Sequence, residues 1–210
     1  MMDLGEIRIR SIDLSGHPRT LVKDGTMADD FPEENLNEDV ALLRDAWVNE
    51  LNAPELLSFQ TDLISDLVEQ VQNQQSYVDD MSADVATLTE ERSFTNKLYQ
   101  MEIDRIKYML ASYLRIRLRK IEQHTMHVLN ESLDKMSQGE IDYAHSFKDL
   151  YEIDHPNLDA FVFCQTVEDI GNVQIDDRGS EHVNARKNDR HVLRYRVVRS
   201  LVEEGKVTLL

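Results

Sequence analysis

Histidines and a carboxylate at helical spacing are the first side chains in this 210-residue sequence whose types fit chemistry. His124 and His127 are three positions apart and Glu131 follows four positions later, so a helix would place all three on one face. Two imidazoles and one carboxylate can hold zinc or iron. The alternative, which we favour, is a set of surface histidines near the ends of helices.

Two further candidates have less specific patterns. Glu152 and His155 have the spacing of half a di-iron motif, but such a site needs a second pair and more carboxylates. Cys164, the single cysteine, lies among apolar residues, where burial as a small hydrophobic residue is its usual role. The sequence has no nucleophile elbow, phosphate-binding loop or dinucleotide motif. We therefore predict a non-enzymatic protein without metal, cofactor or small-molecule ligand.

The charge is large and unevenly distributed. The formal net charge is -17, and residues 36–90 hold twelve acidic side chains and one basic side chain. Residues 91–122 reverse this balance, with eight basic and four acidic side chains. The field of the whole chain repels phosphate, so we expect the basic segment to face acidic helices of this chain or of a partner. A direct contact with DNA is the alternative.

The pattern along the chain predicts a mainly helical protein with a small β-rich domain at its C-terminal end. Apolar residues at steps of three and four, with breaks at Pro54, at 81–84 and at 137–139, indicate a bundle of helices. The longest predicted helix covers Ser93–Val128, and shorter ones cover Met126–Met136 and Glu140–Tyr151. No run of residues is apolar enough to cross a membrane.

After His155 and Pro156 the pattern changes to strands. We predict four, at Ala160–Val167, Val173–Ile175, Arg190–Val198 and Val207–Leu210. The predicted organisation is therefore a flexible acidic arm at residues 1–35, a helical domain at residues 36–153 with a long central helix, and a small β domain at residues 154–210.

The middle of the long helix is too apolar for a helix with one wet face. Nine of the thirteen residues in Ile106–Leu118 are apolar or aromatic. In one interpretation, other helices of this chain cover both sides of this segment. We favour a second chain, because the remaining helices are few and acidic.

Several segments resemble, in order and spacing, those of one known family. They are Ala46–Glu50 with Ala53–Leu57, Gln100–Leu110 leading into Ser112–Glu122, Pro156–Phe163, His191–Tyr195 and Gly205–Leu210. From residue 38 to the end, the chain is similar to the Sld-five family of subunits of the GINS complex. Residues 1–35 match nothing in that family.

The resemblance implies a function in DNA replication. GINS is a heterotetramer in which this chain would join the Psf-one, Psf-two and Psf-three types in a 1:1:1:1 ratio. The tetramer joins the Cdc-forty-five protein and the MCM hexamer to form the replicative helicase for initiation and elongation. Because ATP hydrolysis belongs to the MCM motor, this chain would be a non-catalytic scaffold in the nucleus.

Two hypotheses follow for the long helix. In the scaffold hypothesis, seven of its residues lie at or under a subunit interface, namely Tyr108, Tyr113, Leu114, Arg115, Arg117, Leu118 and Ile121. In the alternative, the chain is a nucleic-acid-binding replication or chromatin factor. Its DNA contacts would then be Arg115, Arg119 and Lys120, with Arg105, Lys107 and Arg117 as further cations.

Overall fold

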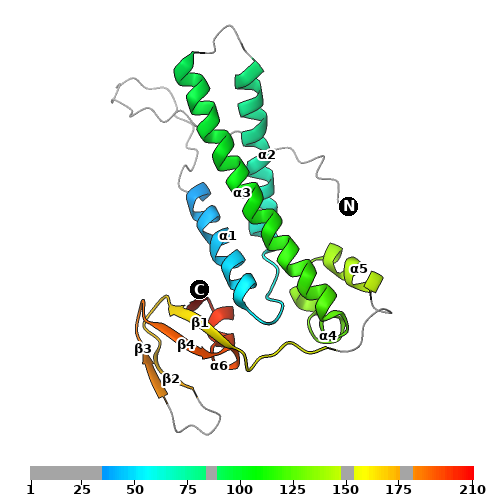
Figure 1. The fold of residues 1–210 in the computed structure, drawn as a ribbon, viewed down its shortest axis with the longest axis vertical. Helices are drawn as coiled ribbons and strands as arrows, with labels where there is room; N and C mark the ends of the chain where they lie inside the picture. The colour runs from blue at the N-terminus through cyan, green and yellow to red at the C-terminus, as the bar shows by residue number, and fades with distance from the viewer. Residues whose placement is uncertain (1–34, 84–88, 148–153, 176–181) are drawn as a thin grey trace, which may run out of the picture. The chain divides into compact units, whose positions relative to one another are not determined.

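Residues 35–83, 89–147, 154–175 and 182–210 are described by the computed structural model of the chain (Figure 1). The helices are α1 (Asn35–Asn52), α2 (Thr61–Ala83), α3 (Glu90–Gln123), α4 (Thr125–Glu131) and α5 (Gln138–Phe147), with a 3-10 turn η2 at Leu133–Lys135. The C-terminal part holds β1 (Phe161–Thr166), β2 (Gly171–Gln174), β3 (His182–Ala185), β4 (Arg190–Arg194), α6 (Tyr195–Glu203) and β5 (Val207–Leu209). A helical bundle followed by a small β-sheet domain is the predicted fold class, which is confirmed. The predicted arm at residues 1–35 lies, but for Asn35, outside the described residues.

The chain folds as two compact units, and the first contains the start of α1, nearly all of α2 and α3 up to Tyr108. Its buried apolar side chains recur at helical steps along α2 and α3. They are Val40 on α1, Ile64, Leu67, Val71 and Val78 on α2, and Ile103 and Ile106 on α3. Polar side chains also join α2 to α3. Gln75 donates a hydrogen bond of 2.9 Å to Gln100, and its side-chain oxygen accepts one of 2.7 Å from Nζ of Lys107.

The second unit contains the end of α1, the loop after it, the rest of α3 and everything that follows. One apolar cluster in this unit joins the loop to the later helices. Its buried members are Leu56, Ile121, Val128, Met136 and Ala144. The loop after α1 is thus part of a core, and it brings polar groups with it.

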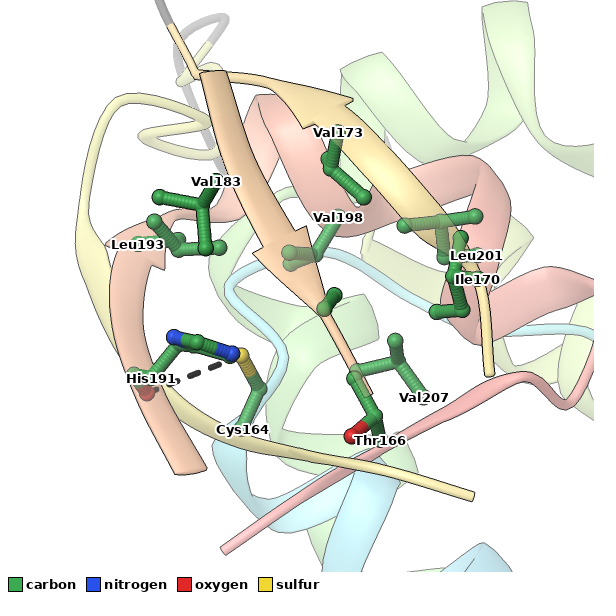
Figure 2. Close-up of a pocket in the computed structure, with 11 residues that line it drawn as sticks. Cys164, Thr166, Ile170, Val173, Val183, His191, Leu193, Val198, Leu201 and Val207 are labelled. Carbon is green, nitrogen blue, oxygen red and sulfur yellow. Dashed lines mark hydrogen bonds between the residues drawn. The ribbon is translucent and has the colours of Figure 1, made fainter. Parts of the chain in front are cut away.

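The β domain is built on a three-stranded antiparallel sheet in the order β4-β1-β5, with β2 and β3 forming a separate hairpin. The strand β1 is central, and Cys164 faces His191 on β4 and Leu209 on β5. Figure 2 shows the apolar hollow of this domain, with Cys164 directed toward the backbone oxygen of His191 at 3.6 Å. Side chains from both sheets and from α6 line it, among them Val173, Val183 and Val198.

The predicted strand Arg190–Val198 is wrong in its second half. The strand β4 ends at Arg194, and Tyr195 begins the helix α6. The buried residues of α6 recur at steps of three and four, namely Tyr195, Val198 and Val202. This segment therefore follows the helical period and not the alternation that the sequence also contains. Gly205 ends α6 with a φ of +71°, and its neighbour Lys206 donates a bond of 2.9 Å back to the oxygen of Leu201.

Two other elements, α3 and β3, differ from the sequence prediction. The long helix α3 stops at Gln123, and His124, with φ of -120° and ψ of 34°, separates it from α4. The strand β3 was not predicted, because its four residues include only one strongly strand-forming side chain, Val183. The predicted helix at Glu140–Tyr151 corresponds to α5, and residues 148–153 lie outside the described part. None of the described helices is long and apolar enough to cross a membrane.

Candidate interaction surface

The seven α3 residues predicted at an interface fall into a buried set and an accessible set. Tyr113, Arg117 and Ile121 are at most 1% exposed. Tyr108 and Arg115 are exposed, while Leu114 and Leu118 are half-buried. This chain itself covers the surface of the buried three, so within a subunit interface they would lie under the contact surface.

Arg117 is the largest fully buried side chain of the described residues, and all five of its N–H donors face acceptors. Nε donates to Oε1 of Glu140 at 2.7 Å, and Nη2 donates to Oε2 of the same carboxylate at 3.1 Å. Nη1 donates to Oε2 of Glu50 at 3.0 Å and to the backbone oxygen of Leu57 at 2.7 Å. The backbone oxygen of Lys135 accepts the last bond, from Nη2 at 2.9 Å. One guanidinium thus links α3 to α1, α5, the loop after α1 and the 3-10 turn η2.

Aromatic rings complete the surroundings of this guanidinium. Its central carbon lies 5.1 Å from the ring centre of Phe59 and 5.6 Å from that of Tyr113. Burial by itself lowers the pKa of Arg117, but the hydrogen bond to Glu140 and the charges of Glu50 and Glu140 outweigh burial and raise it. The cation is therefore permanent, and its role within this chain is structural.

Lys120, one turn along α3, uses the same carboxylate. Its ammonium donates to Oε1 of Glu50 at 2.8 Å, to the backbone oxygen of Glu50, and to the backbone oxygen of Glu55 at 2.8 Å. Burial lowers the pKa of Lys120, while the charge of Glu50 opposes that shift. Glu50 thus stands between two cations that would otherwise repel each other.

Glu55, in the loop after α1, holds the β domain through α6. Its Oε1 accepts a hydrogen bond of 2.9 Å from the hydroxyl of Tyr195, and its Oε2 accepts one of 2.7 Å from Nη2 of Arg199. Burial, and then the charge of Glu55, raise the pKa of Tyr195. The side-chain oxygen of Asn49 accepts a further bond of 2.7 Å from the backbone N–H of Leu209 on β5. The β domain is therefore docked on the end of α1 and its loop.

These contacts occupy two of the cations considered for DNA contact. Arg117 is buried, and the three donors of Lys120 are bound to the α1 end and its loop, which disfavours a DNA contact by either residue. Arg105 is paired with Glu102 on the same helix. Arg115 and Arg119 remain exposed. A continuous basic face is therefore absent from the described part of α3, which disfavours duplex binding.

The first half of α3 carries an exposed apolar stripe. We give this name to Phe94, Leu98, Met101 and Tyr108, which recur at steps of four, three and seven and are 49 to 67% exposed. These steps place all four on one face of the helix, opposite the buried Ile103 and Ile106. Apolar patches of this kind on a helix mark sites of protein contact.

A second exposed apolar surface lies on the three-stranded sheet. Phe161 and Phe163 project from one face of β1, and Val192 on the neighbouring strand β4 is paired with Phe163. All three are more than half exposed, and the guanidinium of Arg194 lies 5.8 Å from the ring centre of Phe161. The opposite face of β1, with Val162 and Cys164, is buried in the domain core.

The candidate metal ligands are regrouped by the fold. Nδ1 of His124 lies 3.2 Å from the backbone oxygen of Asp154 and takes no part in a cluster with His127. His127 and Glu131 are instead joined by His155. Glu152 lies outside the described residues. Cys164 is buried, and burial raises the pKa of its thiol, which is the opposite of what a nucleophile needs.

Sequence reasoning missed the carboxylates that organise the second unit. Glu50 and Arg117 are 67 positions apart, and Glu55 and Tyr195 are 140 positions apart, so no local pattern pairs them. One signal was present: an arginine and a lysine within an apolar helix must find carboxylates if they are buried. Glu50, Glu55 and Glu140 are each followed by a large apolar residue, which is a weak signal for that role.

Comparisons with known proteins agree on one family. Residues 62–152 match the family model described as "GINS complex protein helical bundle domain". Residues 156–210 match the one described as "DNA replication complex GINS protein SLD5 C-terminus".

Relatives that carry the name "DNA replication complex GINS protein SLD5" match over most of their length. The relative from Dictyostelium discoideum is 30% identical, and the match covers 86% of this chain and 97% of that protein. The one from Arabidopsis thaliana is 29% identical over 82% of this chain and 91% of its own. The one from Homo sapiens is 27% identical over 80% and 87%.

Proposed function

Since the chain belongs to the SLD5 family of GINS subunits, we propose that it is one of the four structural subunits of a 1:1:1:1 GINS heterotetramer. The family is non-catalytic, and membership implies a role in DNA replication through the GINS complex with other GINS subunits as partners. The finer proposal names those partners as the Psf-one, Psf-two and Psf-three types.

The exposed apolar stripe on α3 is the observation that carries this proposal. Four large apolar side chains along one helix face are in contact with water when the chain is alone. Full burial of such a side chain in an interface is favourable by roughly 1.5–3 kcal/mol. We propose that helices of sister subunits cover the stripe. Leu114, Arg115 and Leu118, further along α3, are proposed to extend the interface.

The proposed complex joins the Cdc-forty-five protein and the MCM hexamer into the replicative helicase in the nucleus. In that assembly the motor supplies ATP hydrolysis and this chain supplies fixed geometry. The buried network around Arg117 supports a scaffold role, because a permanent cation with five bonds holds the end of α1, α3 and α5 in one arrangement.

We also propose a division into an arm at residues 1–35, a helical domain at 36–153 and a β domain at 154–210. The change from helices to strands between α5 and β1 supports the second boundary. Deleting residues 1–35 should leave assembly intact, and loss of the complex on that deletion would mean that the arm is structural.

Size-exclusion chromatography with light scattering tests the proposal on this chain, alone and co-expressed with three sister subunits. We expect a single species with the mass of four chains from co-expression and a poorly soluble chain alone. A well-behaved monomer of 24.4 kDa that does not bind the sisters would overturn the proposal.

A further inference from the structure

Three metal-ligating side chains converge where the chain approaches the β domain. His127 and Glu131 lie one turn apart on α4, and His155 comes from the segment before β1. One ligand atom from each lies within 4.8 Å of the other two. We propose that these three side chains bind a zinc ion that ties the segment before β1 to α4.

Two of the three distances between ligand atoms match those around a tetrahedral ion. Nδ1 of His155 is 3.2 Å from Nδ1 of His127, which is 3.5 Å from Oε2 of Glu131. Zinc binds imidazole nitrogen and carboxylate oxygen at about 2.0–2.2 Å, which puts neighbouring ligand atoms of a tetrahedron roughly 3.3–3.5 Å apart. The two imidazole rings meet at 76° with their centres 5.1 Å apart, so they do not stack and their Nδ1 atoms are the near contact.

Hydrogen bonding alone does not serve all three groups. Nδ1 of a neutral imidazole carries either one hydrogen or one lone pair. If Nδ1 of His127 accepts from His155, its single lone pair is used and it has no hydrogen to offer the carboxylate of Glu131. If it donates, one hydrogen must serve two acceptors. A cation among the three atoms is attractive to every one of them.

The donor set favours zinc over magnesium and calcium. Two nitrogens and one carboxylate oxygen suit zinc, while magnesium and calcium prefer oxygen alone. His127 is mostly covered, with 14% of its side chain exposed, and Glu131 is 60% exposed, so the ion can enter from water and keep a water as its fourth ligand.

The position of the site gives the ion a structural role. His124, one turn before His127, already contacts the backbone oxygen of Asp154. A metal bond to His155 would fix the next residue of the same segment. The ion would therefore restrict the connection between α5 and β1, and this role is independent of whether the chain assembles with GINS subunits.

Zinc binding to the full-length chain tests the inference, with any histidine tag removed. If the chain needs sister subunits to stay soluble, the co-expressed complex is used and the variants isolate this site. The protein is dialysed against buffers of fixed free zinc, and the bound metal is counted by elemental mass spectrometry. We expect one ion per chain at this site, with His127→Gln and His155→Gln each weakening binding at least roughly tenfold.

A matched control and a second readout keep the test decisive. His145→Gln changes an exposed histidine on α5 and should bind zinc like the wild type. Zinc should raise the melting temperature of the wild type and of His145→Gln, but not that of the two site variants, because only a ligand of the folded state stabilises it. Absence of zinc binding by the wild type, or equal binding by wild type and both site variants, would overturn the inference.

Discussion

The hydroxyl of Tyr195 donates a buried hydrogen bond of 2.9 Å to the carboxylate of Glu55, which stands 140 positions earlier in the chain. Tyr195 is the first residue of α6, and Glu55 belongs to the loop after α1. Arg199, one turn further along α6, neutralises the same carboxylate. One acidic side chain therefore joins two residues of α6 to the helical part, beside the bond between Asn49 and Leu209.

Tyr195→Phe should loosen this attachment without unfolding the chain. The variant removes one buried hydrogen bond and leaves Glu55 paired with Arg199, so we expect a loss of about 1–2 kcal/mol. Hydrogen exchange measured by mass spectrometry on the assembled complex should show faster exchange across residues 195–203. Arg196→Gln is the control, because its ion pair with Asp159 at 3.0 Å is exposed on both sides and should contribute little. Equal exchange in wild type and Tyr195→Phe would contradict the attachment.

Replacing Arg117 by methionine should prevent folding of the second unit. The variant leaves the carboxylates of Glu50 and Glu140 buried without their main partner, and breaking a buried ion pair costs about 3–5 kcal/mol. Arg117→Lys should also fail, because an ammonium cannot reproduce five directed bonds. The yield of soluble co-expressed complex measures both effects, and Arg119→Met, at an exposed position on the same helix outside the proposed interface, is the control. Normal yield of both Arg117 variants would show that the network is dispensable.

The fold was predictable from the sequence where the pattern is local. The periodicities of α1, α2 and α3, the breaks at Pro54 and His155–Pro156, and the strand β1 follow from propensity and spacing. The short segment at 195–203 was not, because alternation and helical period coexist in Arg190–Val198 and only packing against the sheet decides between them. The burial of one face of α6 depends on tertiary packing, which the local sequence does not show.

The candidate site was predictable only in part, for the same reason. The apolar residues and the cations of one helix predict that other residues cover them. The sequence does not say whether those residues belong to a partner or to the chain itself. The structure assigns Tyr113 and Arg117 to the chain's own core, because Glu50 and Phe59 arrive from 58 to 67 positions away. Sequence spacing carries no information about such pairs.

Raising the pH should destabilise the chain through Tyr195. Burial, and then the charge of Glu55, raise the pKa of this phenol in the folded state. Its contribution to stability is therefore complete below the pKa of an unfolded tyrosine, about 10, and is lost as the pH rises above that value. Urea unfolding of the complex between pH 9 and 11 should show a steeper fall for the wild type than for Tyr195→Phe. Parallel curves would mean that the phenol ionises as readily in the folded chain as in the unfolded one.

Reversing two exposed cations of α3, Lys107 and Arg119, separates the scaffold from the DNA-binding alternative. Lys107→Glu with Arg119→Glu changes two exposed residues of the region predicted to touch DNA, and neither belongs to the proposed interface. We expect the purified complex to keep its affinity for duplex DNA and the slope of that affinity against salt. A loss of affinity with a shallower salt slope would favour direct phosphate contact by these residues.

Tyr108→Asp tests whether the exposed apolar stripe meets a partner. The residue is 62% exposed in the chain, so a carboxylate there should leave the monomer fold intact. Within a subunit interface the same carboxylate would be desolvated without a partner, at a cost of several kcal/mol, and the four-chain complex should be lost. Tyr77→Asp makes the identical change at an exposed tyrosine on α2, away from the stripe, and should assemble normally. Chromatography with light scattering reports assembly, and circular dichroism reports the helical content of both variants. If Tyr108→Asp forms the complex as well as Tyr77→Asp does, the partner surface lies elsewhere on the chain.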